Sequence, residues 1–133
     1  MIITQSKLLK RYSNLTNFFT DISNNNLAFH VQDDLKDVNQ DHKVLASLLD
    51  YNQHSLVHMK QIHSDTVHLV DVNDNFKNPP TCDALITNKI DIPIMVMVAD
   101  CSPVLFYDDI KKVIAVAHVG RAGAFKNIVS NVI

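Results

Sequence analysis

Glycine is scarce in this sequence: among 133 residues only Gly120 and Gly123 are glycines, where average usage would give about nine. Both lie within five residues after His118. Glycine lets the backbone adopt positive φ or approach another group closely. Because the chain uses glycine nowhere else, we expect its chemistry near residues 118–123.

Other shortages exclude whole classes of protein. Two cysteines do not make a disulfide framework. The longest apolar run, Ile92–Ala99, is far shorter than the ~20 residues that cross a bilayer, and the N-terminal residues lack the apolar core of a secretory signal. A net charge of −2 without a basic face argues against nucleic acid. We therefore expect a cytoplasmic protein with reduced thiols and no membrane or nucleic-acid partner.

The length is that of one domain, over residues 1–133, and 47% apolar residues are enough to build a core. In the first half, Asp33-Asp34 is a helix-capping pair, and leucine and valine at helical spacing predict a helix over 34–49. His63 falls in a turn between two apolar stretches. The strands predicted in this half are short: 27–31, 55–59 and 66–72.

From Ala84 onward apolar residues come in continuous runs, which predict strands covered on both faces: 84–86, 94–99, 104–107 and 113–117. Short connectors favour antiparallel neighbours. After Gly123, a stripe at helical spacing predicts one amphipathic helix, which reaches Ile133 without a C-cap glycine: Phe125, Ile128, Val129 and Val132. We predict an α/β (α+β) fold, a mixed β-sheet sandwich flanked by helices and cut short at the C-terminus.

Seven histidines are present, and a single histidine is more often structural or exposed than a ligand. His54 and His58 have the i, i+4 spacing of a helical metal pair. They flank a β-rich stretch, however, where residues four apart lie about 13 Å from each other, so we discount them. His42 is expected on the partly solvated face of the predicted helix.

Cys101 and His118 are better candidates because each lies at the end of an apolar run that predicts a strand. The stretch between them is long enough for one strand–turn–strand passage to bring their side chains together. Two interpretations stay open: a functional pair, or a Cys101 that is only a small buried hydrophobe. Asp100 weakens the second, because a carboxylate is rarely buried without a partner.

Four ordered blocks resemble one family: Gln61-Ile62-His63, Cys82–Thr87, Ala99–Leu105 and Ala117–Gly120. Asn26-Leu27 followed by His30–Asp34 is similar to an earlier block of the same family. This is the bacterial laccase-domain or multicopper polyphenol oxidase family (YfiH-like), whose members are described as zinc-dependent purine nucleoside phosphorylases with adenosine deaminase activity. The resemblance covers about residues 15–133 and implies the family's layered sandwich, which is similar to the fold of a bacterial toxin deamidase.

The resemblance implies that His63, Cys101 and His118 are the zinc ligands and the catalytic centre. Spacing alone nominates only the last two, and does not distinguish His63 from His58 or His68. Three protein ligands leave zinc a fourth position, as in catalytic rather than structural sites. Zinc holds a thiolate deprotonated and lowers the pKa of a bound water toward ~7, which suits attack on a purine C6 in deamination.

Phosphorolysis also needs a phosphate site. Gly120-Arg121-Ala122-Gly123 leads into the last predicted helix, where backbone N–H groups and Arg121 could hold an anion. With Asn26 of the earlier block, Gly120 and Arg121 are therefore the expected substrate- and phosphate-binding residues. The other interpretation stays open: this segment only starts a helix, and Arg121 points to solvent.

The sequence departs from the family pattern at several points. Ser64 stands where glycine is usual, Arg121-Ala122 where Trp-Arg is usual, and Thr20–Asn24 where Thr-Arg-x-Gly-Gly is usual. Family members also continue well past residue 133, so we expect the domain to be partial.

Three functions remain. The first is a zinc-dependent enzyme acting on purine nucleosides and phosphate. The second uses the same residues as a hydrolase, with Cys101 as nucleophile and His118 as its base. The third is a metal-binding fragment without activity. Copper ranks below zinc: two histidines and a cysteine match a blue-copper set, but nothing indicates the several coppers of a true laccase.

Overall fold

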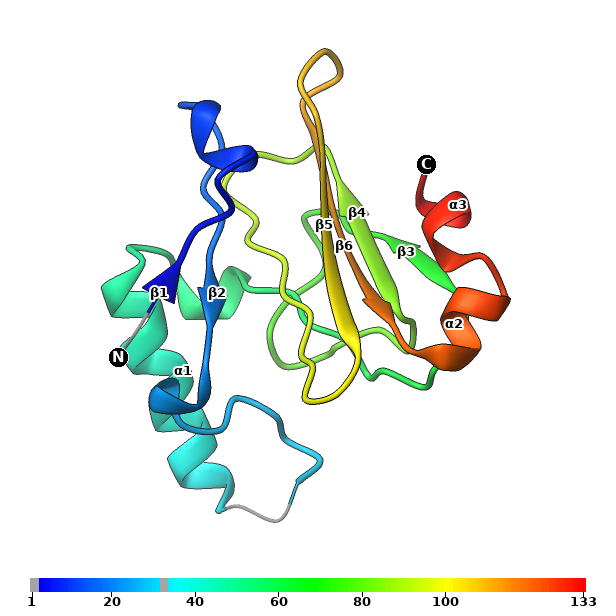
Figure 1. The fold of residues 1–133 in the computed structure, drawn as a ribbon. Helices are drawn as coiled ribbons and strands as arrows, with labels where there is room; N and C mark the ends of the chain where they lie inside the picture. Colours follow the sequence, from blue (N-terminus) through cyan, green and yellow to red (C-terminus); the bar gives the residue numbers. More distant parts are fainter. Residues whose placement is uncertain (1–2, 32–33) are drawn as a thin grey trace. The chain divides into compact units, whose positions relative to one another are not determined.

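The computed structural model describes residues 3–31 and 34–133. They form two compact units: the first ends at Asp50, and the second begins at Tyr51. The first unit holds the longest helix, and the second holds the main sheet (Figure 1). The single domain expected over 1–133 stays a prediction.

The first unit combines a small ribbon with a capped helix. Strands β1 (Ile3–Thr4) and β2 (Phe19–Thr20) pair antiparallel, and two short 3-10 turns, η1 (Leu9–Arg11) and η2 (Ile22–Asn24), accompany them. Helix α1 (Leu35–Leu48) begins after Asp34, whose carboxylate accepts a hydrogen bond from the Lys36 backbone N–H at 2.8 Å. The predicted helix and its N-cap are confirmed. Gln32 and Asp33 of the matched block lie outside the described residues.

Two predictions for the first unit are wrong. Residues 27–31 form no strand; instead the Asn26 carboxamide oxygen accepts from the Ala28 N–H at 2.9 Å, a local turn that competes with strand pairing. His42 is fully buried rather than partly solvated. Its ring stacks on Phe29, and its Nε2 lies 2.8 Å from the Leu27 carbonyl oxygen.

The second unit is built on a four-stranded mixed sheet with the order β3-β4-β6-β5. Its strands are β3 (Val67–Leu69), β4 (Ala84–Thr87), β5 (Ser102–Asp108) and β6 (Val113–Val119). The β3–β4 pair is parallel, whereas β6 pairs antiparallel with both β4 and β5. The mixed α/β class and the antiparallel neighbours are therefore confirmed.

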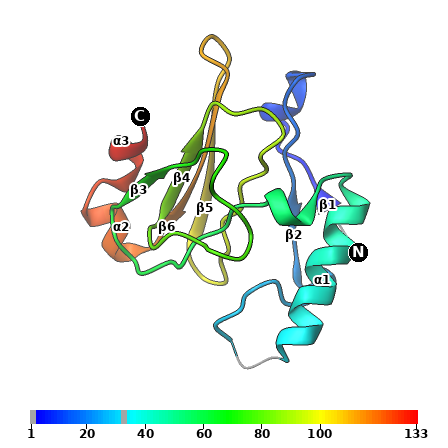
Figure 2. The same ribbon diagram turned by 180° about the vertical axis from the view of Figure 1, so that it is seen from behind.

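Apolar side chains cover both faces of this sheet, as the continuous runs predict. On one face, alanines of β4 and β6 pack against Ile128 and Val132 of the last helix. On the other face, Leu85 and Val116 pack against Val57, Met59 and the 92–96 segment. Figures 1 and 2 show the C-terminal helices on one side of the sheet from both directions. The strand β5 lies at the sheet edge and is only half-buried.

The strands predicted at 55–59 and 94–99 are wrong. Val57 and Ile94 form a single parallel bridge instead, and a short 3-10 turn, η3 (Gln53–Ser55), precedes Val57. The Val57 N–H donates to the Pro93 carbonyl oxygen, and the Met95 N–H donates to the Val57 carbonyl oxygen. Pro93 itself has no N–H with which to extend a ladder. Cys101 therefore does not follow a strand; it precedes β5. The strand predicted over 66–72 is confirmed only at Val67–Leu69.

The single C-terminal helix is also wrong. Asn127 adopts φ 60° and ψ 40° and divides it into α2 (Arg121–Phe125) and α3 (Ile128–Val132). A left-handed residue redirects the chain, so the apolar stripe does not stay on one face. Ile128 and Val132 are buried, whereas Phe125 is 82% exposed.

Candidate metal centre

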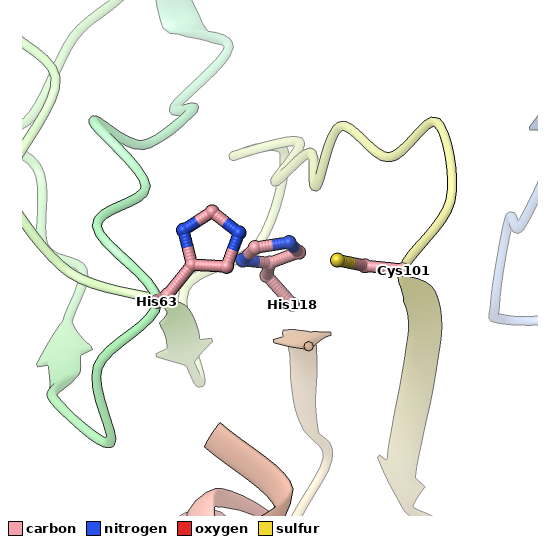
Figure 3. A group of neighbouring side chains, drawn as sticks. All are labelled: His63, Cys101 and His118. Carbon is pink, nitrogen blue, oxygen red and sulfur yellow. The ribbon is translucent and has the colours of Figure 1, made fainter. Parts of the chain in front are cut away.

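His63, Cys101 and His118 come together in the second unit. Their ligand atoms, one from each side chain, all lie within 4.8 Å of one another. Both imidazoles and the thiol point toward one region from three separate segments (Figure 3). His118 is buried, Cys101 is half-buried and His63 is exposed, so one side of the cluster faces solvent.

The pairing of β5 with β6 positions two of the three side chains. Ser102 is opposite Val119, and Pro103 is opposite His118. Cys101, one residue before β5, therefore lies at the same end of the sheet as His118 and Gly120. His63 comes from a separate turn and has φ 59°, an uncommon backbone conformation for a residue other than glycine.

The carboxylate of Asp83 joins the two histidine segments. It lies one residue before β4 and is fully buried. Its Oδ1 accepts from the His63 backbone N–H at 3.0 Å and lies 2.8 Å from His118 Nδ1. Its Oδ2 accepts from the N–H groups of Ile62 and Ser64 and, at 2.6 Å, from the Ser64 hydroxyl. The ring centroids of His63 and His118 are 4.8 Å apart, edge to face.

These contacts determine the charge of Asp83. Burial raises the pKa of the Asp83 carboxyl, but the hydrogen bonds from His118, Ser64 and the backbone lower it by more. The pKa lies below its ordinary value, so the group is a carboxylate that can only accept. His118 Nδ1 is therefore the protonated nitrogen, which leaves Nε2 available to a metal.

Gly120 leaves no spare room beside the cluster. A Cβ atom added to it would lie 3.1 Å from Cδ2 of His63 and 3.2 Å from Sγ of Cys101. Its φ is −85°, which any residue adopts. The glycine thus allows a close approach of the backbone to the two ligands and is not needed for a special backbone angle.

The donor set fits a zinc ion. Two imidazoles and one thiolate are the ligand types of catalytic zinc sites, which keep a fourth position open. From ordinary Zn–N and Zn–S bond lengths, ligand atoms of a tetrahedral site are separated by about 3.3–3.6 Å. No pair of ligand atoms in the cluster therefore needs to close by more than about 1.5 Å to reach this separation.

Of the other expected site residues, Gly120 and Arg121 belong to the second unit with the ligand cluster, and Asn26 belongs to the first unit. Arg121 is exposed at the first position of α2, directly after Gly120. Asn26 belongs to the first unit, where its carboxamide nitrogen donates to the Ala28 carbonyl oxygen at 3.0 Å. Among the described residues, no other histidine joins the three ligands. His58 is buried against Phe76, which agrees with discounting the pair that it forms with His54.

Asp83 is the residue that sequence reasoning missed. It lies inside a matched block, but its role depends on partners 20 and 35 positions away. The available signal was a lone carboxylate between Cys82 and the apolar run of β4. A charge in such a place requires a buried partner.

Fold and site together define an α/β domain with a half-exposed His-Cys-His metal-ligand set. A family model described as multi-copper polyphenol oxidoreductase laccase matches residues 16–133. The chain belongs to this family. The resemblance stated on the sequence blocks is thereby confirmed.

Several relatives and solved structures are similar to the chain. The purine nucleoside phosphorylase of Corynebacterium glutamicum is 38% identical over 109 residues, which are 81% of this chain and 44% of that protein. The purine nucleoside phosphorylase YlmD of Bacillus subtilis is 30% identical over 77% of this chain and 40% of its own. The crystal structure of the Bacillus licheniformis hypothetical protein YfiH superposes with a TM-score of 0.77 and 29% identity, over 80% of this chain and 42% of that one.

The chain spans less than half the length of the relatives named above. In the described ranges 3–31 and 34–133, none of the helices has the length and apolar character that crossing a membrane requires.

Proposed function

We propose that the chain is the metal-binding part of a zinc-dependent purine nucleoside phosphorylase that also deaminates adenosine. The observation that carries the proposal is the His63-Cys101-His118 cluster, in a chain whose relatives bear the name purine nucleoside phosphorylase. We propose zinc in preference to copper because zinc accepts this mixed N/S set in a three-ligand open site.

His63, Cys101 and His118 would hold the ion, with Asp83 keeping the His118 ring in place. When bound, zinc supplies Lewis-acid chemistry to the substrate. Because the cluster is exposed on the His63 side, a nucleoside could reach it from that side. The close approach of Gly120 supports the same assignment, since residue 120 puts no side chain beside the His63 ring and the Cys101 sulfur.

We propose that Arg121, Gly120 and Asn26 bind substrate or phosphate. In phosphorolysis a phosphate oxygen bonds to the ribose C1′ while the bond from C1′ to the purine nitrogen breaks, and the base leaves with a proton. Arg121 suits the phosphate because its guanidinium offers paired donors and because it is exposed one residue from Gly120.

The zinc-loaded chain should be incubated with inosine and phosphate, and with adenosine, and the products separated by chromatography. We expect hypoxanthine with ribose 1-phosphate from inosine, and inosine with ammonia from adenosine. Cys101→Ser is the matched inactive control. A folded, zinc-loaded chain that releases no base and no ammonia would instead be a metal-binding fragment without activity.

One observation favours a second function, a Cys/His hydrolase. The Asp83 carboxylate lies beside Nδ1 of His118, and the Cys101 thiol belongs to the same cluster as His118. The carboxylate can therefore orient an imidazole whose other nitrogen is available to the thiol. This is the arrangement of a nucleophile, its base and an orienting group. Metal decides between the two: chelation would activate such a hydrolase and inactivate a zinc enzyme.

A further inference from the structure

We propose that Asp83 is the positioning residue of the metal centre, in that its single carboxylate orients two of the three ligands before metal arrives. This inference rests on the proposed metal site. It assigns Asp83 no contact with metal or substrate. Its action is exerted through His63 and His118.

Asp83 holds the ring of His118. The Asp83 Oδ1 atom lies 2.8 Å from Nδ1 of His118, and both side chains are buried. A carboxylate acceptor at Nδ1 selects the tautomer in which Nε2 has its lone pair free. A backbone hydrogen bond joins the same two residues, because the His118 N–H donates to the Asp83 carbonyl oxygen at 2.8 Å.

Asp83 also holds the turn that carries His63. Three successive backbone N–H groups, from Ile62, His63 and Ser64, all donate to the same carboxylate. Converging N–H groups form an anion-binding concavity, and here the anion is a side chain of the protein. This concavity stabilises the φ of 59° at His63, which costs free energy in isolation.

Cys101 is the ligand that Asp83 does not touch. Its position follows from the start of the edge strand β5. The centre therefore consists of two histidines held by Asp83 and a thiol positioned by the edge strand β5. Loss of Asp83 should disturb the histidine pair and leave Cys101 in place.

Asp83→Asn tests the role with almost no change in size. In either orientation of the amide, its NH2 group faces at least one backbone N–H of residues 62–64, which loses its acceptor. The chain offers a matched control, because His68 and Asp74 form a second His–Asp pair away from the cluster, 3.0 Å apart. Asp74→Asn removes that carboxylate and leaves the centre intact.

Zn²⁺ affinity should be measured for the wild-type chain and both variants by competition with a chromophoric chelator. We expect a roughly 10- to 100-fold loss of affinity for Asp83→Asn and no loss for Asp74→Asn. Equal affinity in wild type and Asp83→Asn would overturn the role of Asp83 alone. A wild-type chain that binds no Zn²⁺ would overturn the proposed metal site, and this inference with it.

A second readout does not depend on the variant folding. Side-chain ¹⁵N NMR of the metal-free wild-type chain reports the tautomer of His118. We expect the Nδ1–H form. The Nε2–H form in the folded, metal-free chain would contradict the proposal, whatever the fate of Asp83→Asn.

Discussion

Gly120 contacts Cys101 so closely that a single added methyl group would lie 3.2 Å from the Sγ atom. Carbon and a neighbouring heavy atom prefer about 3.5–4.0 Å. The same methyl group would lie 3.1 Å from the ring of His63. Cys101 and His63 therefore both lie against the backbone of Gly120, which has no side chain.

Gly120→Ala should weaken metal binding. Overpacking of this kind costs about 1–3 kcal/mol, so we expect the Zn²⁺ affinity to fall roughly tenfold. Gly123→Ala is the comparison, because its added Cβ would meet Ser64 O, Ile128 and His118 O and no ligand side chain. We expect it to lower the melting temperature and to reduce the affinity by less than Gly120→Ala does. Equal Zn²⁺ affinities in wild type and Gly120→Ala would show that metal binding does not need a residue without a side chain at position 120.

The two cysteines should react very differently. Cys82 is fully buried, and burial raises the pKa of its thiol to about 12, whereas Cys101 is half-buried in the ligand cluster. Iodoacetamide should therefore label only Cys101 in the metal-free chain, neither thiol after zinc loading, and both in denaturant. Mass spectrometry of the peptides identifies the site. Rapid labelling of Cys101 with zinc bound would contradict its role as a ligand.

His58 should make the chain sensitive to acid. Burial lowers the pKa of the His58 imidazole, and the hydrogen bond to the Phe76 carbonyl opposes this only in part. The folded state therefore binds the proton less readily than the unfolded state. The contribution of neutral His58 to the free energy of unfolding is present above the unfolded pKa of about 6.5 and is lost as pH falls below it.

His58→Gln keeps a donor for the Phe76 carbonyl and removes the titration. We expect its free energy of unfolding to decline less than that of wild type between about pH 7 and about pH 5. His54→Gln, at an exposed histidine of the same segment, should retain the wild-type pH dependence. Denaturant titrations across this range measure the difference, and parallel curves for all three chains would contradict the account.

Ile128 anchors the C-terminal helices to the sheet. It is fully buried, whereas Ile110 in the β5–β6 turn is 93% exposed. Ile128→Ala should destabilise the fold by about 2–5 kcal/mol, and Ile110→Ala should change it by less than about 0.5 kcal/mol. Denaturant unfolding of the two variants makes the comparison. Similar losses in both would contradict the packing of α3.

The sequence predicts the strands of the sheet better than it predicts the site. Runs such as 113–117 are apolar on both faces because both faces of β6 are covered. The run at 94–99 is equally apolar, but only Ile94 and Val96 pack against the sheet, and Val98 is exposed. An apolar run therefore does not by itself indicate strand pairing. The spacing of the apolar residues likewise did not predict the break at Asn127. Ile128 and Val132 are buried although one continuous helix does not form.

Cys101 and His118 could be nominated from sequence because β5 and β6 are neighbours along the chain. His63 could not be chosen without the family resemblance. Its place in the cluster depends on the turn that Asp83 holds from 20 positions away. No periodicity encodes such a contact.

Metal binding by wild type and ligand variants tests the account most directly. Purified chains should be loaded with Zn²⁺ for stoichiometry and with Co²⁺ for spectroscopy, using Cys101→Ser and His118→Ala, with His54→Ala as the exposed-histidine control. The account predicts one ion per wild-type and His54→Ala chain, thiolate-to-cobalt absorption that disappears in Cys101→Ser, and loss of stoichiometric zinc in both ligand variants. Stoichiometric zinc retained by both Cys101→Ser and His118→Ala would contradict it.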